Sequence, residues 1–270
     1  DMFQLFLDQT MTYSAGIFRS KDSTLEQASI EKLDTICRKL ELEPGHHLIE
    51  VGSGWGSFAI HAATHYGCKV TTTTISQEQY QLASDRIVAA GLQDRVTLLL
   101  CDYRDLEGKY DRLVSIEMIE AVGHQYLPQY FGKCASLLKD DGRMLIQAIT
   151  MPDQRYAQYL TRTDFIQQFI FPGSCVPSLS AMLSAVSDKT DLRVETIENF
   201  GPDYATTLHC WLENFMANRD HIAALGYDEK FMRLWEYYLC YCEAGFRERY
   251  LGVVHLLMHK PKAAVPELNA

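Results

Sequence analysis

Three glycines at alternate positions constrain the fold of this chain more than any other feature. The segment reads EVGSGWG from residue 50 to residue 56, after the apolar run 48–51 and before the helical run 56–66. Glycine permits a sharp turn and leaves no Cβ between backbone N–H groups and a ligand. The segment therefore predicts a ligand-binding turn that leads from a buried strand into a helix.

Short β-type runs alternate with helical runs along most of the chain. Strands are expected at 48–51, 69–75, 96–101, 113–116, 143–149, 193–197 and 253–259, and helices at 25–40, 56–66, 77–90 and 127–138. A crossover between parallel strands needs about a dozen residues, which the helical runs supply. We therefore predict an α/β fold with a doubly wound, Rossmann-like sheet.

The pattern divides the chain into five parts. An N-terminal helical cover (1–45) precedes the α/β core (46–150), and an inserted aromatic-rich cap (151–187) follows it. The part 188–260 contributes the last two strands, which should close the sheet. The tail 261–270, with two prolines and small residues, is expected to be disordered. The helical pattern already present at residues 2–6 suggests that upstream residues are missing.

Charge and hydropathy limit the partners. The formal net charge of −10 opposes adsorption to nucleic acid or to an anionic membrane. There is no long apolar run and no secretion signal, so we expect a cytoplasmic protein. A lipid would have to be met at a local patch or an apolar mouth, in a transient peripheral contact with a membrane surface.

Cysteine and histidine spacings give no sign of a metal centre. The eight cysteines contain no C-x-x-C pair and predict reduced thiols. The pairs His61 with His65 and His255 with His259 lack an H-E-x-x-H motif and are expected to be surface or core residues.

The glycine spacing discriminates between cofactors. A dinucleotide fold requires G-x-G-x-x-G and an acid at the end of the second strand. Here the third glycine, Gly56, comes one residue early, and Thr74 to Ser76 stand in place of the acid. The segment from Glu50 resembles motif I of the S-adenosylmethionine-dependent methyltransferases. In those enzymes an acid at the position of Asp102 commonly meets the adenine amino group; the alternative for Asp102 is a turn or cap residue.

Six ordered blocks extend this resemblance to the cyclopropane-fatty-acid synthases and mycolic acid cyclopropane synthases. They are DQTMTYS (8–14), TISQEQ (74–79), DYRD (102–105), EMIEAVG (117–123), FPG (171–173) with PS (177–178), and DYATTL (203–208). The blocks run in order across nearly the whole chain, so they are more specific than the glycine turn alone.

The resemblance implies a set of site residues. Those implied to bind S-adenosylmethionine are Tyr13, Ser14, Glu50, Gly52, Gly54, Gly56, Thr74, Gln79 and Asp102. Glu120, Tyr204 and Gln147 would form the reaction centre, and the aromatic cap would form a tunnel for the acyl chain of a phospholipid. Methyl transfer to a double bond creates a carbocation, which aromatic faces stabilise and a base deprotonates.

Three departures from the family affect the base. In the family, a bicarbonate ion held by the equivalent of Glu120 and its neighbours is thought to be the base. This chain has Ala15 where the family has Cys, Ala121 where a His follows the glutamate, and Gln147 in place of another His. Gln147 can still donate a hydrogen bond and keep the anion. Alternatively, loss of a neighbouring proton yields a methylene-branched chain, whose reduction would need a separate reductase. Glu117 is assigned only a structural role.

Two other functions stay open at this stage. The same scaffold serves amine N-methyltransferases, which typically carry Glu-His where this chain has Glu120 and Ala121. A lipid-binding protein without catalysis is the third reading, which the intact glycine turn disfavours. The sequence leaves both a homo-oligomer and the acyl length open.

Overall fold

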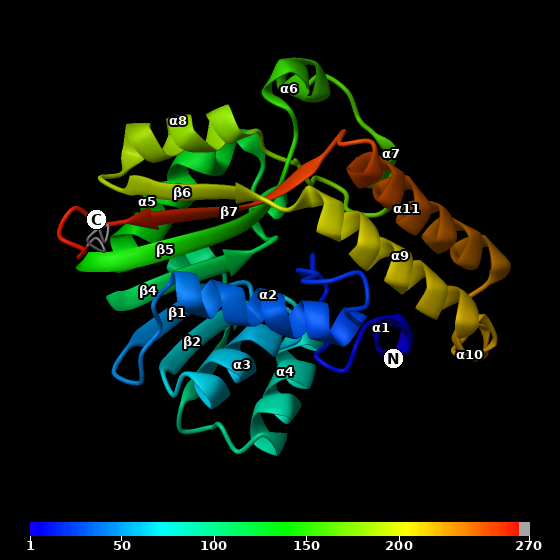
Figure 1. Ribbon diagram of the computed structural model, residues 1–270, viewed down its shortest axis with the longest axis horizontal. Helices are drawn as coiled ribbons and strands as arrows, with labels where there is room; N and C mark the ends of the chain where they lie inside the picture. Colours follow the sequence, from blue (N-terminus) through cyan, green and yellow to red (C-terminus); the bar gives the residue numbers. More distant parts are fainter. Residues whose placement is uncertain (265–270) are drawn as a thin grey trace.

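Seven strands form one sheet in the order β3-β2-β1-β4-β5-β7-β6 (Figure 1). The computed structural model describes residues 1–264. The strands are β1 (His47–Val51), β2 (Lys69–Thr74), β3 (Val96–Leu100), β4 (Tyr110–Ile116), β5 (Leu138–Thr150), β6 (Arg193–Asn199) and β7 (Gly252–His259). The first five are parallel, and β7 runs antiparallel to both of its neighbours. All seven strands were expected, and the predicted doubly wound α/β sheet is confirmed.

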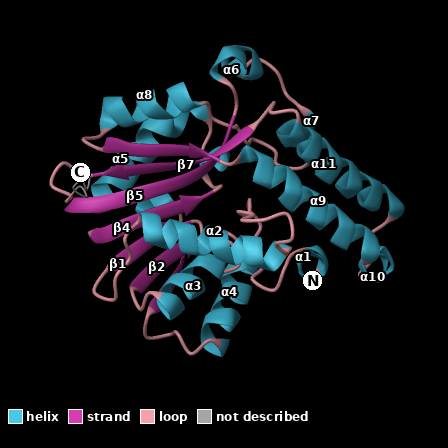
Figure 2. Cartoon of the chain, in the orientation of Figure 1, coloured by secondary structure: helices cyan, strands magenta, loops and turns pink. Residues whose placement is uncertain are grey.

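Helices cover both faces of this sheet (Figure 2). They are α1 (Met2–Phe6), α2 (Leu25–Lys39), α3 (Ser57–His65), α4 (Gln77–Ala89), α5 (Leu127–Leu137), α6 (Asp153–Tyr159), α7 (Phe165–Phe169), α8 (Leu179–Lys189), α9 (Gly201–Ala217), α10 (Arg219–Ala224) and α11 (Glu229–Arg247). Three short 3-10 helices, η1 (Tyr103–Asp105), η2 (Ile119–Ala121) and η3 (His124–Tyr126), follow β3 and β4. On one face α2 and α3 pack against the strands, and on the other α5 and α8 do so.

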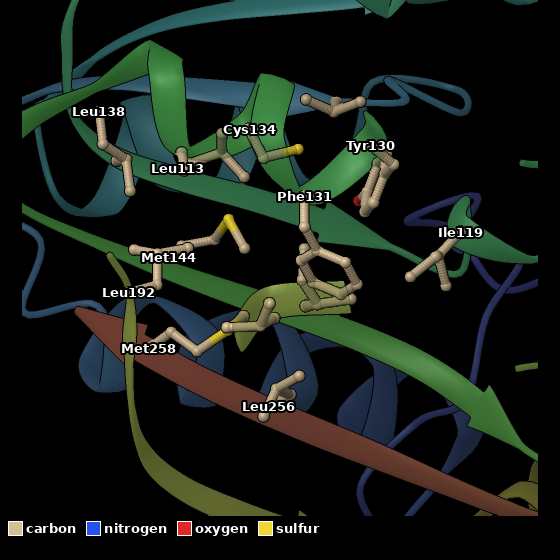
Figure 3. Packing of buried hydrophobic residues seen from close by; sticks show 14 of the residues in the cluster. Leu113, Ile119, Tyr130, Phe131, Cys134, Leu138, Met144, Leu192, Leu256 and Met258 are labelled. Atoms are coloured by element: carbon tan, nitrogen blue, oxygen red, sulfur yellow. The ribbon is translucent and has the colours of Figure 1, made fainter. Parts of the chain in front are cut away.

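Alternate residues of each central strand enter opposite cores. Leu113 packs in the core with α5 and α8, whereas its neighbour Val114 packs in the core with α2 and α3. Figure 3 shows the first of these cores, to which α5 contributes Phe131 and β7 contributes Leu256 and Met258. Both faces of the strands are apolar because both are covered.

A third core holds a helical lobe at the carboxyl ends of the parallel strands (Figure 1). Its buried members include Phe6 of α1, Trp211 and Phe215 of α9, and Leu239 of α11. Most of the lobe therefore comes from the segment between β6 and β7. Residues 179–187 of the expected cap instead form α8, whose stripe of Met182, Ala185 and Val186 packs against the sheet. From the rest of that segment, Phe165 and Ile166 of α7 and the following Ile170 pack against the lobe core.

The first four residues of the expected disordered tail are ordered. The backbone N–H of Lys262 donates to the Asp140 carbonyl at 3.3 Å, and Arg143 Nη2 donates to the Ala264 carbonyl at 2.6 Å. The expectation was wrong for 261–264, because these residues form hydrogen bonds with the first half of β5. Residues 265–270 lie outside the described part of the chain.

The described residues also test the expectations about cysteines and membrane-spanning helices. All eight cysteines are unpaired thiols. Within 1–264, no helix is long and apolar enough to cross a membrane.

Candidate active site

The glycine turn lies at the carboxyl end of β1 and bends through left-handed backbone. Gly52, Gly54 and Gly56 have φ of +99°, +48° and +87°, a region that side chains with a Cβ rarely adopt. A Cβ on Gly56 would lie 3.2 Å from the Ala83 Cβ, whereas one on Gly54 would meet no atom within 4 Å. The turn thus packs closely against α4 at one end and faces open space in its middle. This geometry fits a bound cofactor.

An acid and a lysine are buried beside the turn. Glu50 is 2% exposed, and its Oε2 accepts a hydrogen bond from Thr72 Oγ1 at 2.6 Å. Burial raises the pKa of Glu50 to about 8. Lys32 of α2 is 1% exposed and donates to Ser14 Oγ at 2.8 Å. Burial lowers the pKa of Lys32 to about 8, an effect that nearby carboxylates oppose.

The other residues implied to bind the cofactor lie around the same strand edge. Thr74 Oγ1 donates to Gln79 Oε1 at 2.8 Å, which ties the end of β2 to α4. The Tyr13 hydroxyl lies 2.8 Å from that of Tyr238. Asp102 follows β3, as expected. Both its carboxylate oxygens accept from the guanidinium of Arg104, at 2.9 and 2.7 Å.

This pairing makes Asp102 a turn and cap residue, which was the alternative to an adenine contact. Asp102 also caps η1, through a hydrogen bond from the Arg104 backbone N–H. These hydrogen bonds lower the pKa of Asp102. A contact with adenine stays a prediction and would have to coexist with Arg104.

Glu117 lies at the centre of the candidate site, although the sequence assigned it only a structural role. Its Oε2 accepts from the Tyr204 hydroxyl at 2.7 Å. Its Oε1 accepts from Gln147 Nε2 at 2.7 Å and from the Ala15 backbone N–H at 2.9 Å. One carboxylate thus joins β4, β5, α9 and the N-terminal segment.

The sheet register explains how Glu117 reaches this position. Ile116 pairs with Gln147 across β4 and β5, and the Glu117 N–H donates to the Gln147 carbonyl at 2.8 Å. Glu117 is one of only four non-glycine residues with positive φ in the described chain, at +48°. Such backbone costs energy and is concentrated at functional sites. The sequence signal was an acid directly after a buried strand; which side chains meet it depends on the register.

Burial raises the pKa of Glu117, and three hydrogen bonds oppose that rise. The bond from Tyr204 has the largest opposing effect, followed by those from the Ala15 N–H and from Gln147. The nearby Lys32 adds a smaller opposing attraction. The arrangement therefore places the Glu117 carboxyl group, with three donors already in contact with it, in a poorly hydrated position.

Glu120 occupies a different position, on η2. Its Oε1 accepts from the Ile149 N–H at 2.7 Å, and its Oε2 is buried with no hydrogen-bond partner among the described residues. Burial, and then repulsion from Glu117, raise the pKa of Glu120 to about 8. Burial and the neighbouring Glu117 thus favour the protonated form of Glu120, whereas Glu117 accepts hydrogen bonds from three donors.

Aromatic rings line the lobe side of this site. The Tyr204 ring lies 4.5 Å from that of Phe246 and 6.0 Å from that of Trp211, between ring centroids. Tyr13 lies 5.2 Å from Trp211. Ring faces of this kind stabilise cations. Tyr204 thus combines a ring in the aromatic wall with a hydroxyl on Glu117.

Comparison with known proteins shows which family this chain resembles. The family model described as mycolic acid cyclopropane synthetase matches residues 1–256. The tuberculostearic acid methyltransferase UfaA1 of Mycobacterium tuberculosis is 43% identical over 94% of this chain and 61% of its own length. The cyclopropane-fatty-acyl-phospholipid synthase of Escherichia coli is 39% identical over 92% of this chain and 62% of its own length. The chain thus spans about three-fifths of these two relatives.

Solved structures of methyltransferases have the same fold as this chain. The mycolic acid cyclopropane synthase CmaA1, complexed with SAH and CTAB, aligns with a TM-score of 0.89 at 32% identity, over 96% of this chain and 94% of that one. Coclaurine N-methyltransferase aligns with a TM-score of 0.81 at 22% identity, over 96% of this chain and 80% of its own, a likeness of fold alone. The family match, the relatives and the sheet together lead to one assignment: the chain belongs to the mycolic acid cyclopropane synthetase family of S-adenosylmethionine-dependent methyltransferases.

Proposed function

We infer that this chain carries out S-adenosylmethionine-dependent C-methylation of a double bond in a fatty acyl chain of a phospholipid, with Glu117 as the base. The observation that carries this inference is the Glu117 carboxylate, held by Tyr204, Gln147 and the Ala15 N–H at the strand edge that bears the glycine turn. Membership of the family supports methyl transfer to lipid.

The cofactor would lie along the glycine turn. Gly52, Gly54 and Gly56 would present backbone N–H groups to its amino-acid end, with Glu50, Tyr13 and Ser14 nearby. Thr74 and Gln79 would meet the ribose side. When bound, S-adenosylmethionine supplies an electrophilic methyl group.

Glu117 would do the work that bicarbonate is thought to do in the family. The Gln147 amide, the Tyr204 hydroxyl and the Ala15 N–H could otherwise bind an external anion, but all three donate to Glu117. An added anion would also meet repulsion from this carboxylate. Bicarbonate therefore does not fit this set of donors. The replacements that put the anion site in doubt, Ala15 and Gln147, are both contacts of Glu117.

The two Glu117 oxygens differ in the capacity to take a proton. Oε1 accepts two hydrogen bonds, and Oε2 accepts one, from Tyr204. Oε2 therefore keeps a lone pair for a proton from the acyl chain. Addition of the methyl group to the alkene would form a C–C bond as the methyl–sulfur bond of the donor breaks, and it would leave a cation on the adjacent acyl carbon. The rings of Tyr204, Phe246 and Trp211 would stabilise that charge, and proton loss to Glu117 would neutralise it.

The product that we favour is a methylene-branched chain. Proton loss with ring closure would give a cyclopropane, whereas a hydride shift followed by proton loss gives a methylene group. Several relatives carry names that describe methylation: UfaA1, a probable fatty acid methyltransferase of Pseudomonas putida, and the sphingolipid C9-methyltransferases. A methyl branch would then require two electrons and two protons, delivered as a hydride and a proton, from a separate reductase.

Labelled product analysis tests this function. The 270-residue chain would be incubated with methyl-labelled cofactor and vesicles of unsaturated phospholipid, in buffer with and without bicarbonate. Label should enter the acyl chain at equal rates in both buffers. Mass spectrometry should show that ozonolysis releases it as formaldehyde and leaves a ketone, as a methylene branch requires. A labelled ring would correct the product, and a rate that depends on bicarbonate would remove Glu117 as the base. Label that appears only on amines added to a parallel reaction would overturn lipid methylation.

A further inference from the structure

A row of hydrogen-bonded side chains extends from Glu117 towards the protein surface. Gln147 Oε1 lies 2.9 Å from His255 Nε2, and His255 Nδ1 lies 3.0 Å from Lys39 Nζ. Lys39 in turn donates to Glu198 Oε2 at 2.6 Å. Gln147 and His255 are both fully buried, whereas the Glu198 side chain is 59% exposed.

The sheet register builds this row. Gln147 of β5 pairs with His255 of β7, and His255 pairs with Glu198 of β6. Lys39 reaches the row from the last turn of α2, which covers this face of the sheet. Residues opposite one another on neighbouring strands lie on the same face, so their side chains can meet. Three strands and one helix therefore converge on the His255 ring.

The two ends of the row fix its direction. An ammonium can only donate, so Lys39 requires a lone pair on His255 Nδ1. The proton of the neutral imidazole is then on Nε2, which donates to Gln147 Oε1. The Gln147 amide must therefore direct its NH2 group the other way, towards Glu117 Oε1 at 2.7 Å and the Ala15 carbonyl at 3.5 Å. A carboxylate can only accept, so each donor in the row faces an acceptor.

The surroundings of His255 favour the neutral ring. Burial, together with the charges of Lys39 and Lys32, lowers its pKa well below the usual value. The Phe200 ring lies 4.6 Å from it, between centroids. A protonated ring would place two donors between the Lys39 ammonium and Gln147, and one of them would lack an acceptor.

We propose that Lys39 and His255 are positioning residues that orient the Gln147 amide so that it donates to Glu117. The proposal rests on Glu117 as the base. Without this row the amide is free to rotate by half a turn, which would set its carbonyl oxygen against the carboxylate. Glu117 would then lose a donor, and its affinity for protons would rise before the acyl chain delivers one.

The first measurement determines which His255 ring nitrogen carries the proton, and it requires no turnover. Nitrogen NMR of labelled histidine distinguishes a protonated from an unprotonated ring nitrogen, and the signal lost in His255→Asn identifies the residue. In the wild-type chain Nε2 should carry the proton and Nδ1 should not. In Lys39→Met a mixture of tautomers is expected. A wild-type ring with its proton on Nδ1 would overturn the proposal.

The second measurement connects the row to catalysis. Lys39→Met should lower kcat for methyl transfer by about tenfold, the loss expected for one hydrogen bond to a charged group, with KM for the cofactor unchanged. Its pH–rate profile should move to higher pH, and Lys39→Arg should restore both. The control is Lys260→Met, because Lys260 is similarly enclosed, at 14% exposed against 18% for Lys39, and also pairs with a carboxylate.

The outcomes separate the two claims. A kcat and pH profile of Lys39→Met that match those of Lys260→Met would refute the positioning role, even if the tautomer is as expected. A wild-type chain that transfers no methyl group to lipid would refute the proposed function instead. The His255 tautomer would still show whether the donors of the row point from Lys39 towards Glu117, as described.

Discussion

The Tyr204 hydroxyl donates to Glu117 Oε2 at 2.7 Å, across a separation of 87 residues in the chain. The contact joins the helical lobe to the carboxyl edge of the sheet. It also combines an aromatic ring and a carboxylate at one point. These are the two groups that a cationic intermediate on an acyl chain requires.

Glu117→Gln should abolish most of the turnover and keep cofactor binding. The amide has nearly the shape of the carboxylate but cannot take a proton, so methyl transfer should fall by about 100-fold or more. The rate is measured with labelled cofactor, and binding by calorimetry. Glu213→Gln is the control, because the Glu213 side chain is 68% exposed. Turnover within about threefold of the control would exclude Glu117 as the base.

Tyr204→Phe separates the hydroxyl from the ring. The hydrogen bond from Tyr204 opposes the rise in the pKa of Glu117, so its removal should raise that pKa further. A base works in its ionised form, and activity is lost as pH falls through its pKa. The acidic limb of the pH–rate profile should therefore move to higher pH in Tyr204→Phe. Tyr204→Leu, which also removes the ring, should lose more activity at every pH. If the acidic limb does not move in Tyr204→Phe, the Tyr204 hydroxyl does not control the pKa of the base.

The sequence predicted the fold better than it predicted the reaction centre, and the reason is physical. Apolar runs and glycine turns are local, so all seven strands could be located from them. The partners of Glu117 depend on the pairing of Ile116 with Gln147 and on the place where Ala15 crosses the sheet edge. Neither is encoded by local periodicity. The resemblance to the family identified Gln147 and Ala15 as departures, and the structure gives both a contact with Glu117.

Two glycines of the turn should fail in different ways when replaced by alanine. Gly56→Ala places a Cβ 3.2 Å from the Ala83 Cβ at a φ of +87°, so it should lower the free energy of unfolding by about 1–3 kcal/mol. In Gly54→Ala the new Cβ meets no protein atom within 4 Å, so cofactor affinity should fall more than stability does. Denaturant unfolding and calorimetry separate the two effects. Equal losses of affinity and stability in both variants would contradict a cofactor over Gly54.

Glu120 should make the wild-type chain lose stability as pH rises. Its pKa is raised from 4.5 in the unfolded chain to about 8 in the folded one, so the folded state holds a proton that the unfolded state releases in this window. Its contribution is complete below the unfolded pKa and declines as pH rises from about 4.5 to 8. Glu120→Gln cannot lose a proton, so its free energy of unfolding relative to wild type should increase by about 1–4 kcal/mol between pH 5 and pH 8.

Urea unfolding of both proteins across that range measures the difference. Glu50 also has a raised pKa, of about 8, but it is present in both proteins, so its effect cancels. A difference that stays constant with pH would mean that the folded chain keeps Glu120 ionised beside Glu117. Two adjacent carboxylates would then share the site, and Glu120 would compete with Glu117 for the proton that the acyl chain releases.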